Sequence, residues 1–175
     1  MMDHQKKNRG VPVTCRNSTS DRHLEIISDL SEYNPVLCGT FPIGIDVDGS
    51  DMDIILEVYD FNGFEEKVKV LYGDLEGFRI KRKTIRNQPI IKANFTDLGM
   101  EYELFGQRQP VEKQYAYLHM VIEKVLLEEV PGLRKKVIQL KKQGIKTEPA
   151  FCEVLGIVGD PYEGLIEFGK KKGII

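Results

Sequence analysis

The sequence predicts an α+β protein, with strands dominating the first hundred or so residues and helices the remainder. Up to residue 109, short apolar or alternating segments are separated by turns that contain glycine or asparagine, which is typical of strands. From Pro110 onward, apolar residues recur every three or four positions, which predicts helices. A run of strands followed by a run of helices favours the α+β class over a regular βαβ alternation.

The composition describes an ordinary soluble domain. Of its 175 residues, 41% are hydrophobic and 30% are charged, enough for a real core beneath a charged surface. The formal net charge of −2 argues against a dedicated duplex-DNA binder. We find neither an apolar run of the roughly 20 residues that a membrane span needs nor a signal peptide. Three scattered cysteines predict reduced thiols, so we expect a cytoplasmic protein without a membrane partner.

The individual elements follow from apolar spacing and turn residues. We expect a flexible N-terminal lead-in over residues 1–20, a mixed α/β core over 21–109, and a helical region over 110–175 packed on the core. Within the core, the pattern predicts a helix from Asp21 to before Asn34-Pro35, strands over 36–38 and 52–59, a turn at Asn62-Gly63, a helix over 64–71, and strands over 78–85, 89–95 and 100–105, the last two as a hairpin. In the C-terminal region it predicts a long helix from Tyr115 to Pro131-Gly132 and shorter helices over 133–143, 148–155 and 162–172.

The most informative chemistry lies in the segment Ser50-Asp51-Met52-Asp53-Ile54. Successive side chains of a strand point to opposite faces, so Asp51 and Asp53 project to the same side. Two carboxylates placed this closely repel each other unless a cation lies between them. A hard divalent ion such as Mg²⁺ accepts this arrangement, often together with substrate phosphates. The pair therefore predicts a metal site, although surface strands often carry such pairs without one.

A tight turn precedes the acidic pair. Gly39 has no Cβ and allows backbone to approach a ligand closely. Thr40 offers a hydroxyl and an amide to a phosphate. Ser50 could orient the neighbouring carboxylates or cap a turn. We predict Gly39, Thr40 and Ser50 as nucleotide-binding residues.

The same residues resemble a known family. The pattern resembles the signature of the nucleotidyltransferase superfamily related to polymerase beta, and of its minimal bacterial members in particular. It consists of an apolar strand, then Gly39-Thr40, Gly44 and Ser50-Asp51-Met52-Asp53-Ile54, at the same spacing as in those enzymes. This resemblance implies a nucleotidyltransferase-like mixed β-sheet with flanking helices. It also implies triphosphate contacts at Gly39 and Thr40, and Mg²⁺ (or Mn²⁺) at Asp51 and Asp53.

The superfamily uses a third carboxylate from a later strand. Glu101 and Glu103 share one face of the strand around 100–105, and we prefer Glu103 because apolar neighbours flank it. Two departures stand out. Ile43 occupies a position where the minimal enzymes usually carry Arg, and Pro42 falls in what is commonly the first turn of a helix, where proline is acceptable.

A second resemblance covers most of the chain. The segments 39–46, 103–107 and 114–120 are similar to a small bacterial family of unknown function with a nucleotidyltransferase-like fold, over roughly residues 21–169. We therefore predict a metal-dependent enzyme that transfers a nucleotidyl group from a nucleoside triphosphate to an unidentified hydroxyl on a small molecule, protein or RNA. The alternatives are a non-catalytic nucleotide-binding or toxin–antitoxin-type interaction protein that retains the fold, and a phosphohydrolase.

Two further groups of residues leave both functional and structural interpretations open. The basic segment Arg79 to Arg86 could face a triphosphate or a nucleic-acid backbone, but a solvated edge strand is the more common explanation. Gln114, Tyr117 and His119 could hold a base or an acceptor if the start of the long helix faces the acidic pair. A packed or surface histidine is more common than a catalytic one. The basic residues 134–136 and 141–142 are expected on solvated helix faces.

Overall fold

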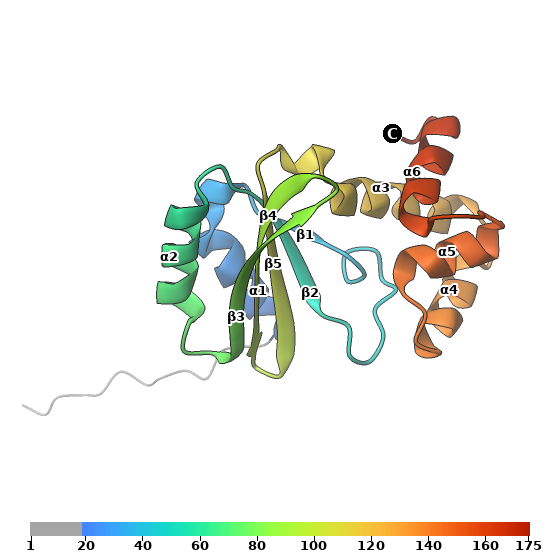
Figure 1. Cartoon of the computed structure of the whole chain (residues 1–175). Coiled ribbons are helices and arrows are strands. Elements are labelled where there is room, and N and C mark those ends of the chain that lie inside the picture. The colour runs from blue at the N-terminus through green and yellow to red at the C-terminus, as the bar shows by residue number, and fades with distance from the viewer. Residues whose placement is uncertain (1–18) are drawn as a thin grey trace, which may run out of the picture.

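The computed structural model describes residues 19–175, so most of the predicted N-terminal lead-in falls outside it. Its centre is a mixed five-stranded sheet with strand order β1-β2-β5-β4-β3 (Figure 1). The strands are β1 (Val36–Cys38), β2 (Met52–Glu57), β3 (Glu76–Ile85), β4 (Gln88–Asp97) and β5 (Met100–Gln107). Strands β2 and β5 run parallel, and the other neighbouring pairs are antiparallel. This architecture confirms the predicted α+β class and its mixed sheet.

Two helices cover one face of the sheet, α1 (Thr19–Asp29) and α2 (Phe61–Tyr72). Alternation along β5 turns Tyr102 and Leu104 to this face, where they join Ile54 of β2 and Phe64 of α2 in the main core. The intervening residues of β2 and β5 point to the opposite face. The polar side chains of the acidic segment are therefore directed away from this core.

Local turn chemistry explains where the elements begin and end. The predicted turn at Asn62-Gly63 is wrong, because both residues lie in the first turn of α2. The Asp60 side chain accepts a hydrogen bond from the Asn62 backbone N–H at 3.0 Å, which caps the helix earlier than expected. The hairpin between β4 and β5 is confirmed, with Leu98 and Gly99 both at positive φ, as a two-residue hairpin turn requires.

The C-terminal region is helical, as predicted. It contains a short 3₁₀ turn, η2 (Val111–Lys113), followed by α3 (Tyr115–Glu129), α4 (Leu133–Lys142), α5 (Thr147–Leu155) and α6 (Pro161–Lys171). A further 3₁₀ turn, η1 (Ser31–Tyr33), precedes β1. Figure 1 shows these four helices grouped beside the sheet, on the side of β1 and β2. They enclose a second core that also takes in Ile43 and Ile45 from the loop after β1. Within residues 19–175, no helix is long and apolar enough to cross a bilayer.

Candidate functional site

A cleft of about 810 Å³ separates the open face of the sheet from the C-terminal helices. The sheet contributes residues of β2 and β5 together with the turn after β1, and the opposite wall comes from α3, α6 and the segment that begins α5. Five of the predicted site residues and the preferred third carboxylate line this cleft, namely Gly39, Thr40, Ser50, Asp51, Asp53 and Glu103. Residues that lie 64 positions apart in the sequence, Gly39 and Glu103, therefore meet at one place.

Strand register creates a polar row across the floor of the cleft. Asp53 of β2 is paired with Cys38 of β1 on one side and with Glu103 of β5 on the other. Glu103 is in turn opposite Asn94 of β4, which pairs with Arg79 of β3. Since residues in register on adjacent strands face the same side of a sheet, Asp53 and Glu103 are neighbours on the open face. The parallel pairing of β2 with β5 thus brings the carboxylates together.

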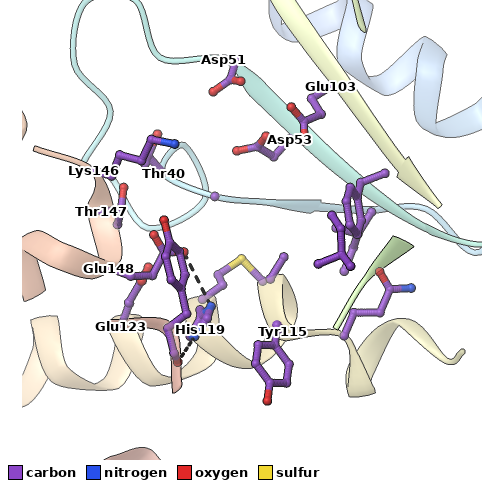
Figure 2. A pocket seen from close by; sticks show the side chains of 18 of the residues that line it. Thr40, Asp51, Asp53, Glu103, Tyr115, His119, Glu123, Lys146, Thr147 and Glu148 are labelled. Atoms are coloured by element: carbon purple, nitrogen blue, oxygen red, sulfur yellow. Dashed lines mark hydrogen bonds and ion pairs between the residues drawn. The ribbon is translucent and has the colours of Figure 1, made fainter. Parts of the chain in front are cut away.

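Asp51, Asp53 and Glu103 form a compact cluster. One carboxylate oxygen of each lies within 4.8 Å of the others, and all three residues are partly buried. Figure 2 shows the three side chains gathered beside the start of β2, with Glu103 reaching them from β5. Burial, together with the charges of Asp51 and Glu103, raises the pKa of Asp53 to about 7. Such a cluster of like charges holds a proton readily, and a cation stabilises it for the same reason.

Two basic residues distinguish Glu103 from Glu101. Lys92 of β4 pairs with Oε2 of Glu103 at 2.5 Å, and the Asn94 amide donates to the same oxygen at 3.4 Å. Glu101 is exposed, lies outside the cluster and pairs with Arg79 at 3.2 Å. Among residues 19–175, no ion pair involves Asp51 or Asp53. Glu103 therefore keeps one oxygen free of Lys92, and the two aspartates keep all of theirs.

Gly39 has a role that the sequence does not reveal. A Cβ at this position would lie 2.3 Å from Oδ2 of Asp53, and the residue has φ +72°, a conformation that favours glycine. The close approach is therefore between the Gly39 backbone and the Asp53 carboxylate. A side chain at residue 39 would displace the central member of the cluster.

The segment after Gly39 is a hydrogen-bonded turn. The Ile45 N–H donates to Thr40 and the Gly44 N–H to Phe41, each at 3.2 Å, without a following helix. The helix that Pro42 could have opened is therefore absent here. The side chain of Ile43, which stands where the minimal enzymes usually carry arginine, is buried in the helical core. Arg134 of α4 donates to the carbonyls of Ile43 and Gly44 and ties this turn to the helices.

Ser50 organises the loop before β2. Its hydroxyl accepts a hydrogen bond from the Val47 N–H at 2.9 Å, while its own N–H donates to the Val47 carbonyl. This reciprocal pair closes the loop that leads into Asp51. The contacts match the turn-capping role considered from the sequence, and the side chain also borders the cleft.

The helical wall supplies polar residues that sequence reasoning missed, namely Glu123, Lys141, Lys146, Thr147, Glu148 and Tyr162. Lys141 is half-buried and donates to Thr147 Oγ1 at 3.1 Å, so its expected place on a solvated face is wrong. Burial raises the pKa of Glu123 well above its usual value, with a smaller contribution from Glu148. The one available signal was an acidic residue, Glu123, within the apolar run of the long helix.

The start of α3 does face the cleft, and Gln114 and His119 line it. His119 is buried, with Nε2 2.9 Å from the Tyr162 carbonyl and Nδ1 3.6 Å from Glu148, which is a packed histidine. Tyr117 packs in a small apolar cluster instead.

The basic strand β3 is exposed, and its arginines pair with carboxylates, as in Arg82 with Glu65 at 2.8 Å.

The sequence and the fold can now be compared with known proteins. Residues 22–168 match the family of a domain of unknown function, DUF4269. The chain belongs to this family. The match covers most of the chain and confirms the resemblance to a family without an assigned activity. No curated protein sequence is similar enough to match.

Solved structures share the fold. The Cid1 poly(U) polymerase with Mg 3′-dATP bound has a TM-score of 0.50 at 17% identity, over 70% of this chain and 39% of that one. The GLD-2/RNP-8 complex has a TM-score of 0.52 at 15% identity, over 79% of this chain and 56% of that one. The DUF4269 chain therefore has the nucleotidyltransferase-like fold that its motif resembles, while it spans well under two thirds of these relatives.

Proposed function

We propose that this DUF4269 protein is a divalent-metal-dependent nucleotidyltransferase that moves a nucleotidyl group from a nucleoside triphosphate to a hydroxyl acceptor. The observation that carries the proposal is the convergence of Asp51, Asp53 and Glu103 within 4.8 Å on the floor of the cleft. The nucleotidyltransferase-like fold supports it, since Asp51 and Asp53 lie at the start of β2 and Glu103 lies on the adjacent parallel strand β5.

The donor set fits Mg²⁺ or Mn²⁺. All three side chains offer carboxylate oxygens, the ligands that hard divalent cations prefer. Oxygens around such an ion are about 3 to 4 Å apart, from metal–oxygen distances of about 2.1 Å. The observed spacing therefore needs only small side-chain rotations. A bound cation would neutralise phosphate charge that the carboxylates would otherwise repel.

The remaining predicted residues have roles consistent with this chemistry. Thr40 would donate a hydrogen bond to the triphosphate beside Gly39. Lys146 of the opposite wall would supply the positive charge that Ile43, in place of the usual arginine, does not provide. The acceptor's hydroxyl oxygen attacks the α-phosphorus, the bond from phosphorus to the bridging oxygen breaks, and pyrophosphate leaves. Glu103, through the oxygen that Lys92 does not hold, would accept the hydroxyl proton.

A nucleotide-binding protein without catalysis is the second candidate. Two observations favour it, the buried Ile43 in place of an arginine and the Lys92 ion pair on Glu103. Such a protein would bind a triphosphate with the metal and release it unchanged. A phosphohydrolase would instead release nucleotide without an acceptor.

The experiment that tests the proposal has two readouts. The first is thermal stabilisation of the protein by each nucleoside triphosphate with Mn²⁺ or Mg²⁺, since a ligand that binds only the folded state raises its stability. The second is release of pyrophosphate in the presence of pooled small-molecule, peptide and RNA acceptors. We expect both signals in the wild type and neither in Asp53→Asn. The matched control is Glu101→Gln, which alters a nearby carboxylate outside the cluster and should retain both.

The outcomes separate the candidates. Stabilisation without pyrophosphate release would favour the non-catalytic binder, and metal-dependent hydrolysis without any labelled acceptor would favour the phosphohydrolase. An Asp53→Asn variant that folds and still transfers the nucleotidyl group would contradict the proposed site.

A further inference from the structure

The helical wall of the cleft contains a carboxyl group that the proposed chemistry does not use. Glu123 of α3 is only 3% exposed, borders the cleft, and its Oε1 is buried without a hydrogen-bond partner. A buried polar atom without a hydrogen-bond partner makes folding less favourable, because it has lost its contact with water and gained none in return. Such an atom at the edge of a cleft indicates a group that a ligand completes.

The polar neighbours of Glu123 are engaged elsewhere. Lys141 donates to Thr147 Oγ1, and His119 contacts the Tyr162 carbonyl through Nε2. Glu148 lies on the same side of the cleft as Glu123 (Figure 2), and its charge adds to the pKa rise of Glu123. The charge of Lys141 also acts on Glu123, but Lys141 makes no hydrogen bond to Oε1, so a ligand in the cleft could supply the missing donor.

A second unpaired acceptor lies on the same wall. Gln114 is 1% exposed and uses its amide nitrogen for the Leu56 carbonyl at 3.0 Å, while its Oε1 is buried without a partner. Nine residues separate it from Glu123, or about 13 Å along a helix. Within residues 19–175, the two buried side-chain atoms that border the cleft without a hydrogen-bond partner are both oxygens. A ligand rich in hydrogen-bond donors would therefore complement this wall.

The three acidic residues of the metal site and the pair Glu123 and Glu148 line the same cleft, and Figure 2 shows both groups around it. Glu148 contributes to the raised pKa of Asp53, and both Asp53 and Glu123 contribute to the raised pKa of Cys38. Charges from the metal site and from the helical wall therefore both act on the Cys38 thiol. A ligand that fills this cleft would therefore border both groups of carboxylates.

The charges disfavour a nucleic-acid acceptor. A phosphodiester strand would bring anions against Glu123 and Glu148, which lowers affinity. The arginines of β3 and of the turn after it that could offset this are paired with carboxylates, Arg79 with Glu101, Arg82 with Glu65 and Arg86 with Glu163. The cleft volume of about 810 Å³ falls within the range of small-molecule sites.

We propose, on the basis of the proposed function, that the acceptor is a small molecule carrying an ammonium group close to its reactive hydroxyl, and that Glu123 and Glu148 bind this ammonium. The hydroxyl oxygen of the acceptor forms the new bond to the α-phosphorus, and pyrophosphate leaves with the bridging oxygen. The hydroxyl proton passes to Glu103 or to water. The ammonium group takes no part in the bond changes and orients the hydroxyl.

The test measures transfer of label from an α-labelled nucleoside triphosphate with Mn²⁺. The acceptors are a panel of amino sugars, aminocyclitols and amino alcohols, each with its N-acetylated counterpart, and a single-stranded oligoribonucleotide. We expect at least one amine to be labelled about tenfold or more above its N-acetylated form, and the oligoribonucleotide to remain unlabelled. In Glu123→Gln this preference should fall about tenfold, since a charge-assisted hydrogen bond is lost.

Glu128→Gln on the exposed face of α3 is the matched control and should keep the preference. Thermal melting of Glu123→Gln checks its fold, and stabilisation by triphosphate with Mn²⁺ should match the wild type. An unchanged amine preference in a folded Glu123→Gln, labelling of the oligoribonucleotide alone, or no labelled amine would each overturn the inference. Absence of triphosphate binding by the wild type would instead overturn the proposed function.

Discussion

Asp53→Asn should stabilise the metal-free protein at neutral and alkaline pH, although it removes a residue of the proposed site. In the folded protein the pKa of Asp53 is raised from 3.8 to about 7, first by burial and then by the charges of Asp51 and Glu103. Its ionised form is therefore disfavoured by folding. A pKa difference of about 3 corresponds to about 4 kcal/mol, which we take as an upper bound.

The pH window follows from the direction of the shift. Between about pH 4 and pH 7 the folded protein binds more protons at Asp53 than the unfolded chain does, so the free energy of unfolding decreases as pH rises. Below pH 4 the cost is absent, and above pH 7 it is fully present. Asn cannot ionise, so the variant should gain stability relative to the wild type as pH increases.

The assay is urea unfolding of the wild type and Asp53→Asn at pH 5 and pH 8, in EDTA and in Mn²⁺. In EDTA we expect the variant to gain about 1 to 3 kcal/mol relative to the wild type between the two pH values, because only the interval from pH 5 to the pKa of about 7 contributes, at about 1.4 kcal/mol per pH unit. At 100 times the dissociation constant, Mn²⁺ should stabilise the wild type alone by about 2.7 kcal/mol. Glu101→Gln, an exposed neighbour, is the control and should follow the wild type. A variant that is equally destabilised at both pH values would refute this reasoning, because Asp53 would then be held by favourable contacts.

Three further variants test the surroundings of the cluster. Gly39→Ala should lower Mn²⁺ affinity at least tenfold and cost about 1 to 3 kcal/mol of stability, since the new Cβ would clash with Oδ2 of Asp53 and the residue has a positive φ. Isothermal titration measures the affinity and urea unfolding the stability. Unchanged metal binding would contradict the predicted clash. Lys92→Met should raise Mn²⁺ affinity several-fold in the same titration, because Glu103 Oε2 loses its competing cation, and weaker binding would show that Lys92 supports the site. Arg134→Ala should increase amide hydrogen exchange in the turn over 41–45 that it holds, whereas unaltered protection would mean that the turn is stable without it.

Much of the site could be inferred from residues close together in the chain. The alternation of a strand places Asp51 and Asp53 on one face, and the turn at Gly39-Thr40 is visible in the sequence, so the acidic pair and its neighbouring turn were predictable. The same local logic predicted the helices after Pro110, because their apolar periodicity reflects burial of one face. It failed at Asn62-Gly63, where capping by Asp60 outweighs the turn preference of the two residues.

Long-range pairing accounts for what local patterns could not supply. The preference for Glu103 over Glu101 depended on flanking apolar residues, and only the parallel register of β2 with β5 shows that Glu103 meets Asp53 while Glu101 pairs with Arg79. The helical wall was unforeseeable for the same reason. Glu123 and Glu148 belong to helices, and Lys146 directly precedes one, and the periodicity of these helices says nothing about which surface they face. Packing of the helices against the turn after β1 directs the three residues into the cleft.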